Sequence, residues 1–134
     1  MPVAALIVDD TRLAAQVIRY HLEELGCMVV GEASNASEGL KLFRKFKPRL
    51  VTLDLMMPKV DGIDVLTMLR SVKREAPETV VIVVSAIPFQ KTQDIFDQEG
   101  VLAYIVKPFN QYSFQPVRIK LLRAFPELKS MHAS

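Results

Sequence analysis

The sequence predicts an α/β domain built on a parallel sheet, and three observations carry this prediction. Five short apolar runs recur along the 134 residues, and most of them are continuous rather than alternating. Continuous apolar runs are typical of strands covered on both faces, as in parallel sheets. The stretches between the runs are long enough for helices that cross from one strand to the next. The expected strands are Ala4–Val8, Met28–Val30, Leu50–Leu53, Val80–Val84 and Leu102–Val106.

The segments between these strands show helical periodicity. Apolar residues recur on one helical stripe in each of the first three segments, as expected of helices that pack one face against a sheet. Gly26 suits the end of the first helix, and Pro48 and Pro77 follow the second and the third. The fourth helix is expected from about Pro88 to Gly100. The apolar positions are Leu13, Val17, Leu22 and Leu25, then Ala36, Leu40 and Phe43, then Val65, Leu66, Leu69 and Val72.

Prolines set the limits of the last helix. Pro116 cannot lie in a helix interior, because it lacks a backbone N–H and clashes with the preceding turn. The helix is therefore expected to begin near Ser113, with Pro116 in its first turn, and to end before Pro126. Residues 1–125 then form one domain, and residues 126–134 form a short C-terminal tail. The inward positions of this helix are expected to be Val117, Leu121, Leu122 and Phe125.

Composition and charge argue against several classes of protein. The 17 basic and 15 acidic residues give a net charge of +2, which is too balanced to indicate binding to nucleic acid or to an anionic membrane. Cys27 is the only cysteine, so no internal disulfide and no cysteine zinc cluster are expected. No apolar stretch approaches the ~20 residues of a membrane span, and the first residues do not read as a signal peptide. We therefore expect a cytoplasmic protein with no direct nucleic-acid or membrane partner.

The residues suited to chemistry follow the ends of the predicted strands. In open α/β sheets, ligands bind beyond the carboxyl ends of the strands. Three carboxylates, one hydroxyl and one ammonium group are therefore expected to converge at one edge of the sheet. In chain order these residues are Asp9, Asp10, Asp54, Ser85 and Lys107.

Such a cluster indicates a magnesium site that handles phosphate. At an effective dielectric constant of about 20, two carboxylates about 4 Å apart repel each other by about 4 kcal/mol. A hard divalent cation offsets this repulsion, and Mg²⁺ keeps water ligands that phosphate oxygens can replace. Lys107 and Ser85 supply a point charge and a hydrogen-bond donor for the phosphate. The pattern therefore favours phosphoryl transfer onto a carboxylate, with Asp54 as the nucleophile.

Five segments match the motifs of a known family in their order and spacing. They are LIVDD at 6–10, GEASNASEGL at 31–40, KPRLVTLDLMMPKVDGIDVL at 47–66, VIVVSA at 81–86 and YIVKPF at 104–109. Over residues from about 3 to 125 the chain resembles the receiver domain of bacterial response regulators, and in particular the single-domain chemotaxis regulator. This resemblance implies a flavodoxin-like, doubly wound sheet of five parallel strands in the order 2-1-3-4-5, with helices on both faces.

The resemblance also implies a role for each site residue. Asp54 would be the phosphoacceptor, and Lys107 would contact it at rest and hold the phosphoryl group afterwards. Mg²⁺ would be bound directly by Asp10, by Asp54 and by the backbone carbonyl of Met56, whereas Asp9 would act mainly through a bound water. The chain would not be an enzyme, because it would catalyse only its own phosphorylation and dephosphorylation.

A switch belongs to the same resemblance. Ser85 and Tyr104 occupy the family's switch positions, where the hydroxyl moves toward the phosphoryl oxygen and the aromatic ring turns inward behind it. This movement would repack the face of the fourth helix, the fifth strand and the fifth helix, where partners bind. Pro58 and Gly62 match the loop after the acceptor. Pro108 matches a proline whose preceding peptide bond is often cis in this family.

Two departures from the family pattern lie beside the acceptor. Met56 and Ile87 are apolar at positions that often carry polar side chains. Both are expected to border the path of a water molecule that attacks the phosphorylated aspartate. Because neither side chain can orient that water, we predict slow self-dephosphorylation.

The implied partners are a sensor histidine kinase and a downstream target protein or output domain, and homodimerisation on phosphorylation stays open.

A phosphohydrolase of the haloacid dehalogenase kind is disfavoured, because it requires a second aspartate where Met56 stands. A flavin-binding protein is disfavoured because Asp9 and Asp10 would repel a phosphate. Two alternatives remain: a receiver domain cut from a longer regulator, and an interaction module that is not phosphorylated. The short tail favours a stand-alone regulator over the first of these.

Overall fold

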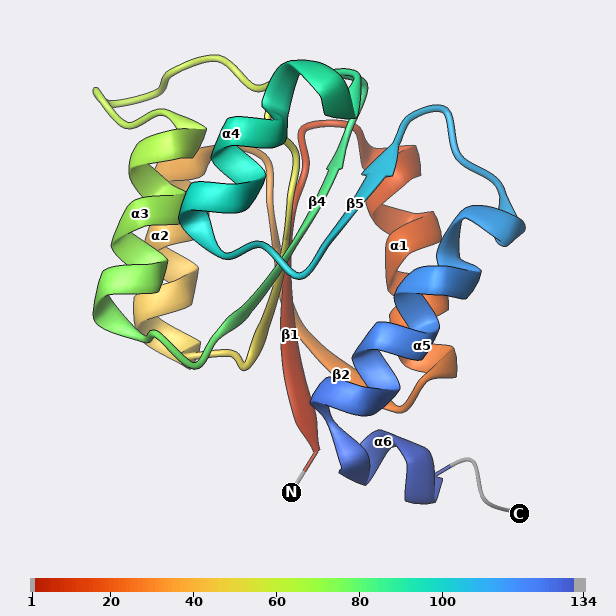
Figure 1. The fold of residues 1–134 in the computed structure, drawn as a ribbon. Helices are drawn as coiled ribbons and strands as arrows, with labels where there is room; N and C mark the ends of the chain where they lie inside the picture. Colours follow the sequence, from red (N-terminus) through yellow and green to blue (C-terminus); the bar gives the residue numbers. More distant parts are fainter. Residues whose placement is uncertain (1, 132–134) are drawn as a thin grey trace.

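The computed structural model describes residues 2–131, except for the side chains of residues 89, 95–97, 111 and 129–131. A five-stranded parallel sheet in the order β2-β1-β3-β4-β5 lies between helices on both faces (Figure 1). The predicted flavodoxin-like fold and its strand order are therefore confirmed. The strands are β1 Val3–Val8, β2 Cys27–Ala33, β3 Leu50–Leu53, β4 Val80–Ser85 and β5 Ala103–Val106. The helices are α1 Arg12–Glu24, α2 Ala36–Phe46, α3 Val65–Glu75, α4 Phe89–Glu99, the 3₁₀ turn η1 Gln111–Phe114, α5 Gln115–Ala124 and α6 Pro126–Met131.

Two apolar cores lie on opposite faces of the sheet. One lies under α1 and α5, and the other lies under α2 and α3 (Figure 1). Along β1, Ile7 packs into the first core, whereas its neighbours Leu6 and Val8 pack into the second. Successive side chains of a strand point to opposite faces, so a strand buried on both faces needs apolar residues at every position. This arrangement explains why the strands appear in the sequence as continuous apolar runs.

Side-chain caps fix the starts of two helices. The Asn35 side chain accepts a hydrogen bond from the Glu38 N–H at 2.8 Å at the start of α2. The Asp64 side chain does the same for the Thr67 N–H at the start of α3, also at 2.8 Å. Each cap satisfies one of the backbone donors that a helix leaves free at its first turn. Asp64 therefore anchors the helix that follows the loop after β3.

The fifth helix begins with a 3₁₀ turn that the sequence did not predict. The α-helix starts two residues after the expected Ser113, and Pro116 lies in its first turn as predicted. In the preceding turn the Asn110 side chain accepts the Tyr112 N–H, and the Ser113 hydroxyl accepts the Asn110 N–H. This reciprocal cap starts the turn before Pro116 is reached.

The buried stripe of α1 differs from the predicted one. Leu13 is 70% exposed and Val17 is only half buried, although the sequence placed both on the inward stripe. The residues of α1 that are buried are Ala15, Ile18 and Leu22. The prediction for Leu13 was wrong, because this side chain lines an open groove together with Pro108 and Phe109 instead of packing against the sheet.

The segment after Phe125, which the sequence analysis treated as a tail, contains the short helix α6. Its Leu128 side chain is fully buried in the core under α1 and α5. Arg49 and Glu127 form an ion pair at 2.7 Å that joins α6 to the start of β3. Residues 132–134 lie outside the described part of the chain. Figure 1 shows α6 below the sheet, beside the N-terminal end of β1.

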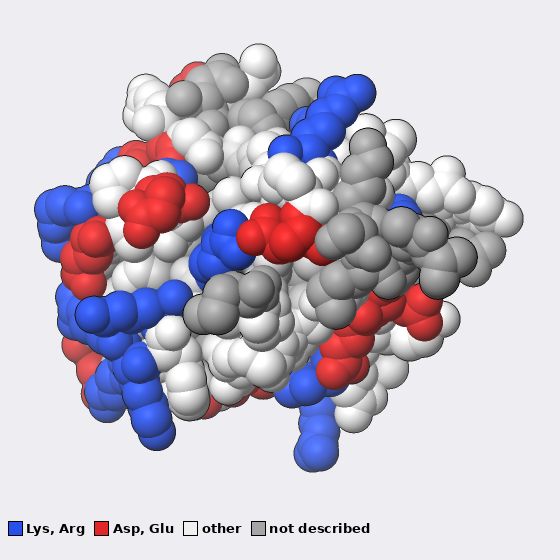
Figure 2. Space-filling view, turned by 90° about the horizontal axis from the view of Figure 1, so that it is seen from below, with Lys and Arg blue, Asp and Glu red and all other residues white. Residues whose placement is uncertain are grey.

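Charged side chains of both signs are interspersed on the surface. Figure 2 shows lysine and arginine next to aspartate and glutamate on the lower face of the molecule. Ion pairs at 2.7 Å join Arg19 to Glu32 and Arg44 to Glu75. Water and salt screen such exposed pairs, so they add little to stability. Among the described helices, none has both the length and the apolar composition needed to cross a membrane.

One buried polar group in the sheet has no hydrogen-bond partner. Thr52 on β3 is 2% exposed, and within the described part of the chain its Oγ1 is the single fully buried side-chain oxygen or nitrogen without a partner. Thr79, which is equally well buried, donates its hydroxyl to the Pro48 carbonyl at 3.3 Å. A buried hydroxyl without a partner loses its hydrogen bonds to water and gains none in return. The Thr52 hydroxyl therefore lowers the stability of the fold, whereas the Thr79 hydroxyl contributes to it.

Thr52→Val is expected to raise the free energy of unfolding by about 1 kcal/mol, because it replaces an unsatisfied hydroxyl with a methyl group of similar size. Thr79→Val is the matched control and is expected to lower it by about 1 kcal/mol, because the Pro48 carbonyl loses its donor. Urea denaturation of the two variants and the wild type measures both changes. A destabilisation by Thr52→Val as large as that by Thr79→Val would contradict this prediction.

Candidate functional site

The acidic residues singled out in the sequence meet at the carboxyl ends of the strands. Asp9 follows β1 and Asp54 follows β3 directly, so these neighbouring strands bring the two residues to one edge of the sheet. Asp9, Asp10 and Asp54 each present a carboxylate oxygen, and these oxygens all lie within 4.8 Å of one another. Asp9 and Asp54 are buried, whereas Asp10 is exposed. The cluster is therefore open to solvent on the side of Asp10.

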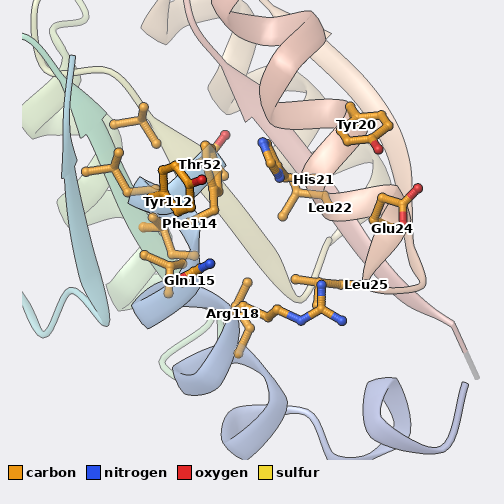
Figure 3. Close-up of a pocket in the computed structure, with 15 residues that line it drawn as sticks. Tyr20, His21, Leu22, Glu24, Leu25, Thr52, Tyr112, Phe114, Gln115 and Arg118 are labelled. Atoms are coloured by element: carbon orange, nitrogen blue, oxygen red, sulfur yellow. The ribbon is translucent and has the colours of Figure 1, made fainter. Parts of the chain in front are cut away.

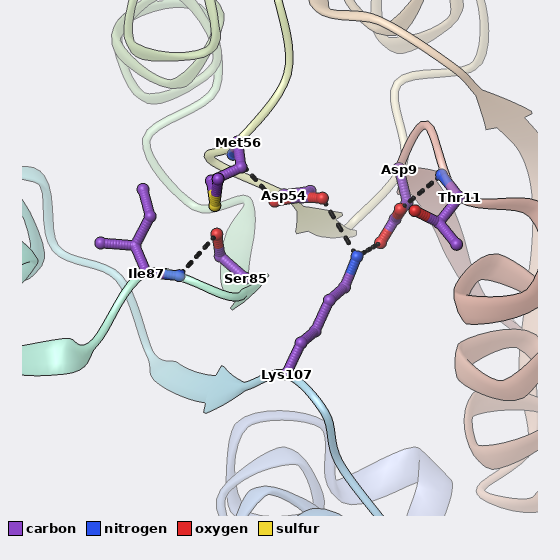
Figure 4. A network of polar contacts seen from close by, with 7 residues as sticks. All are labelled: Asp9, Thr11, Asp54, Met56, Ser85, Ile87 and Lys107. Carbon is purple, nitrogen blue, oxygen red and sulfur yellow. Dashed lines mark hydrogen bonds and ion pairs between the residues drawn. The ribbon is translucent and has the colours of Figure 1, made fainter.

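Lys107 bridges the two buried carboxylates. Its Nζ lies 2.7 Å from Asp9 Oδ2 and 3.0 Å from Asp54 Oδ2 (Figure 4). The exposed fraction of these side chains is 16% for Lys107, 1% for Asp9 and 5% for Asp54. Water screens charges poorly at such burial, so these pairs interact more strongly than pairs on the surface. Three segments far apart in the sequence are thus joined by one ammonium group.

Backbone amides fix the second oxygen of each buried carboxylate. Asp9 Oδ1 accepts the Thr11 N–H, and Asp54 Oδ1 accepts the Met56 N–H, both at 2.8 Å. Figure 4 shows both bonds beside the Lys107 bridge. Each carboxylate is therefore held by a backbone donor on one oxygen and by Lys107 on the other.

Burial and hydrogen bonding have opposite effects on the charged groups of the site. Burial raises the pKa of Asp9 above its ordinary value, although the hydrogen bonds from Lys107 and Thr11 oppose this change. Burial also works against the charge of Lys107, but hydrogen bonds to Asp9 and Asp54 outweigh it and raise the pKa of Lys107. Lys107 is therefore charged at neutral pH.

The donor set fits a hard divalent cation. One ammonium group faces three carboxylates, which leaves a net negative charge at the site. Carboxylate oxygens are the ligands that Mg²⁺ prefers, and it usually takes one or two of them and keeps waters. The exposed Asp10 leaves space for such waters. The predicted magnesium site is thus chemically consistent with the residues that the fold brings together.

The predicted switch residues both contact the loop that follows β4. Ser85, at the end of β4, is fully buried, and its Oγ accepts the Ile87 N–H at 3.5 Å (Figure 4). Tyr104 on β5 is half buried, and its hydroxyl donates to the Ile87 carbonyl. Ser85 and Tyr104 therefore both contact the loop between β4 and α4 at Ile87. Met56 lies near this loop and is 56% exposed.

The remaining residues of the family pattern shape the loops around the site. The peptide bond between Lys107 and Pro108 is cis, as the resemblance implied. In the loop after β3 that contains Pro58, Asp61 and Gly62 have positive φ angles of 53° and 75°. Gly62 tolerates this conformation because it has no Cβ.

An apolar groove that was not expected from the sequence reaches the site. It has a volume of about 410 Å³ and lies between the start of α1 and the segment after β5. The exposed Leu13 forms part of its wall, and Lys107 lies where the groove meets the acidic cluster. The remaining lining residues are Thr11, Ala14, Val17, Ala86, Pro108 and Phe109. Leu13, a large apolar residue at the start of a helix and close to Asp9 and Asp10, could have indicated this groove. Its place on the apolar stripe of the helix led instead to the prediction that it is part of the core.

Comparisons with known proteins agree with this geometry. Residues 5–115 match the family model of the response regulator receiver domain. The chain is 35% identical over 121 residues to an uncharacterized response regulatory protein of Vibrio cholerae, and this match covers 90% of the chain and 48% of that protein. It is 32% identical over 114 residues to the chemotaxis protein CheY of Thermotoga maritima, which covers 85% of the chain and 88% of CheY.

A solved structure shows the same fold. The crystal structure of the CheX-CheY-BeF3-Mg+2 complex from Borrelia burgdorferi matches with a TM-score of 0.77 and 25% identity, over 93% of this chain and 90% of that one. The chain spans about half the length of the first curated relatives that it matches, with 48% of one and 45% of another.

Proposed function

This chain belongs to the response regulator receiver domain family, and we propose that it is a Mg²⁺-dependent phosphorylation switch of a two-component system, with Asp54 as the phosphoacceptor. The observation that carries the proposal is the Asp54 carboxylate, which is held by the Met56 N–H and Lys107 beside two further aspartates. A nucleophile and charges suited to stabilising a transferred phosphoryl group thus lie together at the carboxyl edge of the sheet.

In the proposed reaction, a carboxylate oxygen of Asp54 attacks the phosphorus of a phosphohistidine. A P–O bond to Asp54 forms and the P–N bond to the imidazole breaks, with its electron pair leaving on the nitrogen, which then takes up a proton. The product is an acyl phosphate on Asp54 and a neutral histidine. Lys107 is 3.0 Å from the Asp54 carboxylate, so its ammonium group can follow the negative charge onto the phosphoryl oxygens.

Three groups of the chain would hold the metal. They are the carboxylates of Asp10 and Asp54 and the backbone carbonyl of Met56, with Asp9 acting through a water. Bound there, Mg²⁺ would supply electrostatic stabilisation of the phosphoryl oxygens. The protein residues orient the acceptor: backbone amides hold one oxygen of Asp9 and one of Asp54.

The proposed readout starts at the loop between β4 and α4. Phosphorylation adds a charge of about −1.5 to −2 and new acceptor oxygens next to Ser85. Moving the Ser85 hydroxyl toward them breaks its bond with the Ile87 N–H, and the Ile87 carbonyl also carries the contact with Tyr104. Ser85 and Tyr104 would therefore respond together. The resulting change repacks the face of α4, β5 and α5, where a downstream partner would bind.

The proposed phosphodonor is a sensor histidine kinase, and the apolar groove suits its docking. The groove lies between α1 and the segment after β5 and ends at Lys107, so a helix that fills it would bring a histidine close to Asp54. The exposed Leu13 in its wall favours burial by a partner. This chain would catalyse only its own phosphorylation and dephosphorylation.

The downstream partner is proposed to be either a separate target protein or an output domain. A phosphorylation-dependent homodimer is a further possibility on the same face. The second function that the sequence left open is an interaction module that is not phosphorylated. The complete acidic cluster and its bridge to Lys107 favour the phosphorylated switch.

Intact-mass analysis after incubation with acetyl phosphate and Mg²⁺ tests the proposed function. The wild type is expected to gain one phosphoryl group, which chelation of Mg²⁺ prevents. Asp54→Asn is expected to gain none, whereas Asp94→Asn, which alters an exposed aspartate of α4, is expected to behave as the wild type. No addition to a folded wild type would reject the switch in favour of an interaction module.

The phosphorylated protein is predicted to lose its phosphoryl group slowly, over minutes or longer. Hydrolysis needs a water molecule directed at the phosphorus, and the side chains that border this path, Met56 and Ile87, cannot hydrogen-bond to it. Met56→Gln is expected to speed the decay by about tenfold by holding that water. Met28→Gln, at another exposed methionine, is the control. Timed acid quenching and mass analysis measure the decay; loss within seconds in the wild type would refute the prediction.

A further inference from the structure

We propose that the cavity between α1 and α5 is a binding site for a small aromatic molecule that carries one hydrogen-bonding group, with the Thr52 hydroxyl as its polar partner. This site lies on the face of the sheet under α1 and α5, and it is separate from the acidic cluster at the strand ends. The inference goes beyond the proposed function and does not depend on phosphorylation of Asp54.

The cavity has the size and lining of a ligand pocket. Its volume is about 300 Å³, at the lower end of the range for small-molecule sites. Strands β3, β4 and β5 form its floor, and α1 and α5 form its walls. Figure 3 shows His21 of α1, and Leu25 directly after this helix, facing the segment from Phe114 to Arg118 across the cavity. The apolar floor and wall residues are Leu22, Leu25, Ile82, Val84, Ile105, Val117 and Leu121.

A polar atom lacks a partner at the floor of this cavity. Thr52 lines the pocket, it is 2% exposed, and its Oγ1 has no hydrogen-bond partner among the described residues. Its neighbours on the floor, Ile82 and Val84, offer no polar side-chain atoms. Valine has nearly the same shape, so packing of the sheet does not require a hydroxyl at this position. A ligand that donates to or accepts from this hydroxyl would satisfy it.

The upper wall of the cavity favours a flat ring. The rings of His21 and Phe114 stack with centroids 4.0 Å apart and planes at 13°. Burial lowers the pKa of His21, so the imidazole is neutral at physiological pH and presents an uncharged aromatic surface. Tyr20 and Tyr112 also line the pocket. Aromatic walls of this kind bind ring systems by stacking and edge contacts.

The depth of the hydroxyl distinguishes a small ligand from a protein partner. Thr52 lies on the central sheet beneath both helices, so a flat surface of a second copy that covered α1 and α5 would not reach it. The position also connects the cavity to the site at the strand ends. Thr52 lies two residues before Asp54, and Val84 directly precedes Ser85.

Indole is a suitable probe, because it is a flat ring system with a single N–H donor. Titration of the full chain with indole, followed by amide NMR resonances, is expected to give saturable shifts at Thr52, Ile82 and Ile105, with a dissociation constant of about 1 mM or tighter. Thr52→Val is expected to weaken binding by about tenfold, the value of one hydrogen bond from a buried group, and Thr52→Ser is expected to retain it.

A second variant tests the cavity without altering the sheet. Gln115→Trp places a large ring at the exposed mouth and is expected to abolish the shifts, whereas Ile119→Trp, on an exposed position of α5 outside the cavity, is expected to leave them unchanged. Equal indole affinity for Thr52→Val and the wild type, or shifts that do not saturate, would overturn the proposal. It would also be overturned if Gln115→Trp changed only the self-association of the chain, because the cavity would then be an interface between copies.

Discussion

Replacing Lys107 with methionine is expected to slow phosphoryl incorporation from acetyl phosphate by about 100-fold or more, and to lower the unfolding free energy of the metal-free protein at neutral pH by about 3 kcal/mol. Methionine keeps the length and apolar character of the lysine stem, so the packing beside Pro108 is retained. The change therefore removes the ammonium group and little else.

The expected destabilisation follows from the two carboxylates that would be left behind. Asp9 and Asp54 are buried, and each has one oxygen paired with Lys107, at 2.7 and 3.0 Å. Removing one partner of a buried ion pair leaves an uncompensated charge, which is more costly than losing the pair altogether. Millimolar Mg²⁺ is expected to restore part of the stability, because the cation binds only the folded cluster.

The pH dependence of this variant can be derived from Asp9. Burial already raises the pKa of Asp9 above 3.8, and removal of the Lys107 ammonium raises it further. A carboxyl with a raised pKa in the folded state costs no stability below its unfolded pKa, and the cost grows as the pH rises through the folded pKa. The stability gap between Lys107→Met and the wild type is therefore expected to be smallest near pH 4 and to widen toward neutral pH.

Urea denaturation without metal and timed phosphorylation measure the two effects. Lys91→Met is the control, because Lys91 is an exposed residue of α4 away from the cluster. It is expected to change stability by less than about 0.5 kcal/mol and to leave the phosphorylation rate unchanged. If the two variants had the same stability and the same phosphorylation rate, the Lys107 bridge between Asp9 and Asp54 would contribute to neither.

Leu128→Ala is expected to lower the unfolding free energy by about 3 kcal/mol. The Leu128 side chain is completely buried in the core under α1 and α5, which also contains Leu121 and Phe125. The truncation removes apolar contacts and leaves a cavity that the surrounding helices fill only in part. Leu13→Ala, at a leucine that is 70% exposed, is the control and is expected to change stability by less than about 0.5 kcal/mol.

Denaturation of these two leucine variants also decides whether α6 is part of the folding unit. A loss in Leu128→Ala no larger than that in Leu13→Ala would mean that α6 is not packed in solution. Phosphorylation of Asp54 by acetyl phosphate is expected to survive in Leu128→Ala below its unfolding transition, because α6 lies at the end of the sheet opposite to the acidic cluster (Figure 1).

The sequence by itself determined the order of elements and the place of the acidic cluster. Buried strands need apolar residues at every position, so β1, β3 and β4 could be found as runs without any knowledge of their neighbours. The cluster followed from the same reasoning, because parallel strands bring their carboxyl ends to one edge. Asp9, Asp54 and Lys107 were assigned to that edge from their positions after strands, and the distances of 2.7 and 3.0 Å agree.

Only the tertiary structure decided which apolar residues face the core and which face an open surface. Leu13 fits a helical stripe but lines an open groove, whereas Leu128 looks like part of a tail but is buried in the core under α1 and α5. That the Thr52 hydroxyl has no partner among the described residues could not be predicted from the sequence either, because residues from five separate elements surround it. Periodicity records the local geometry of one element, whereas burial depends on where other elements end, and that is set only when the layers pack.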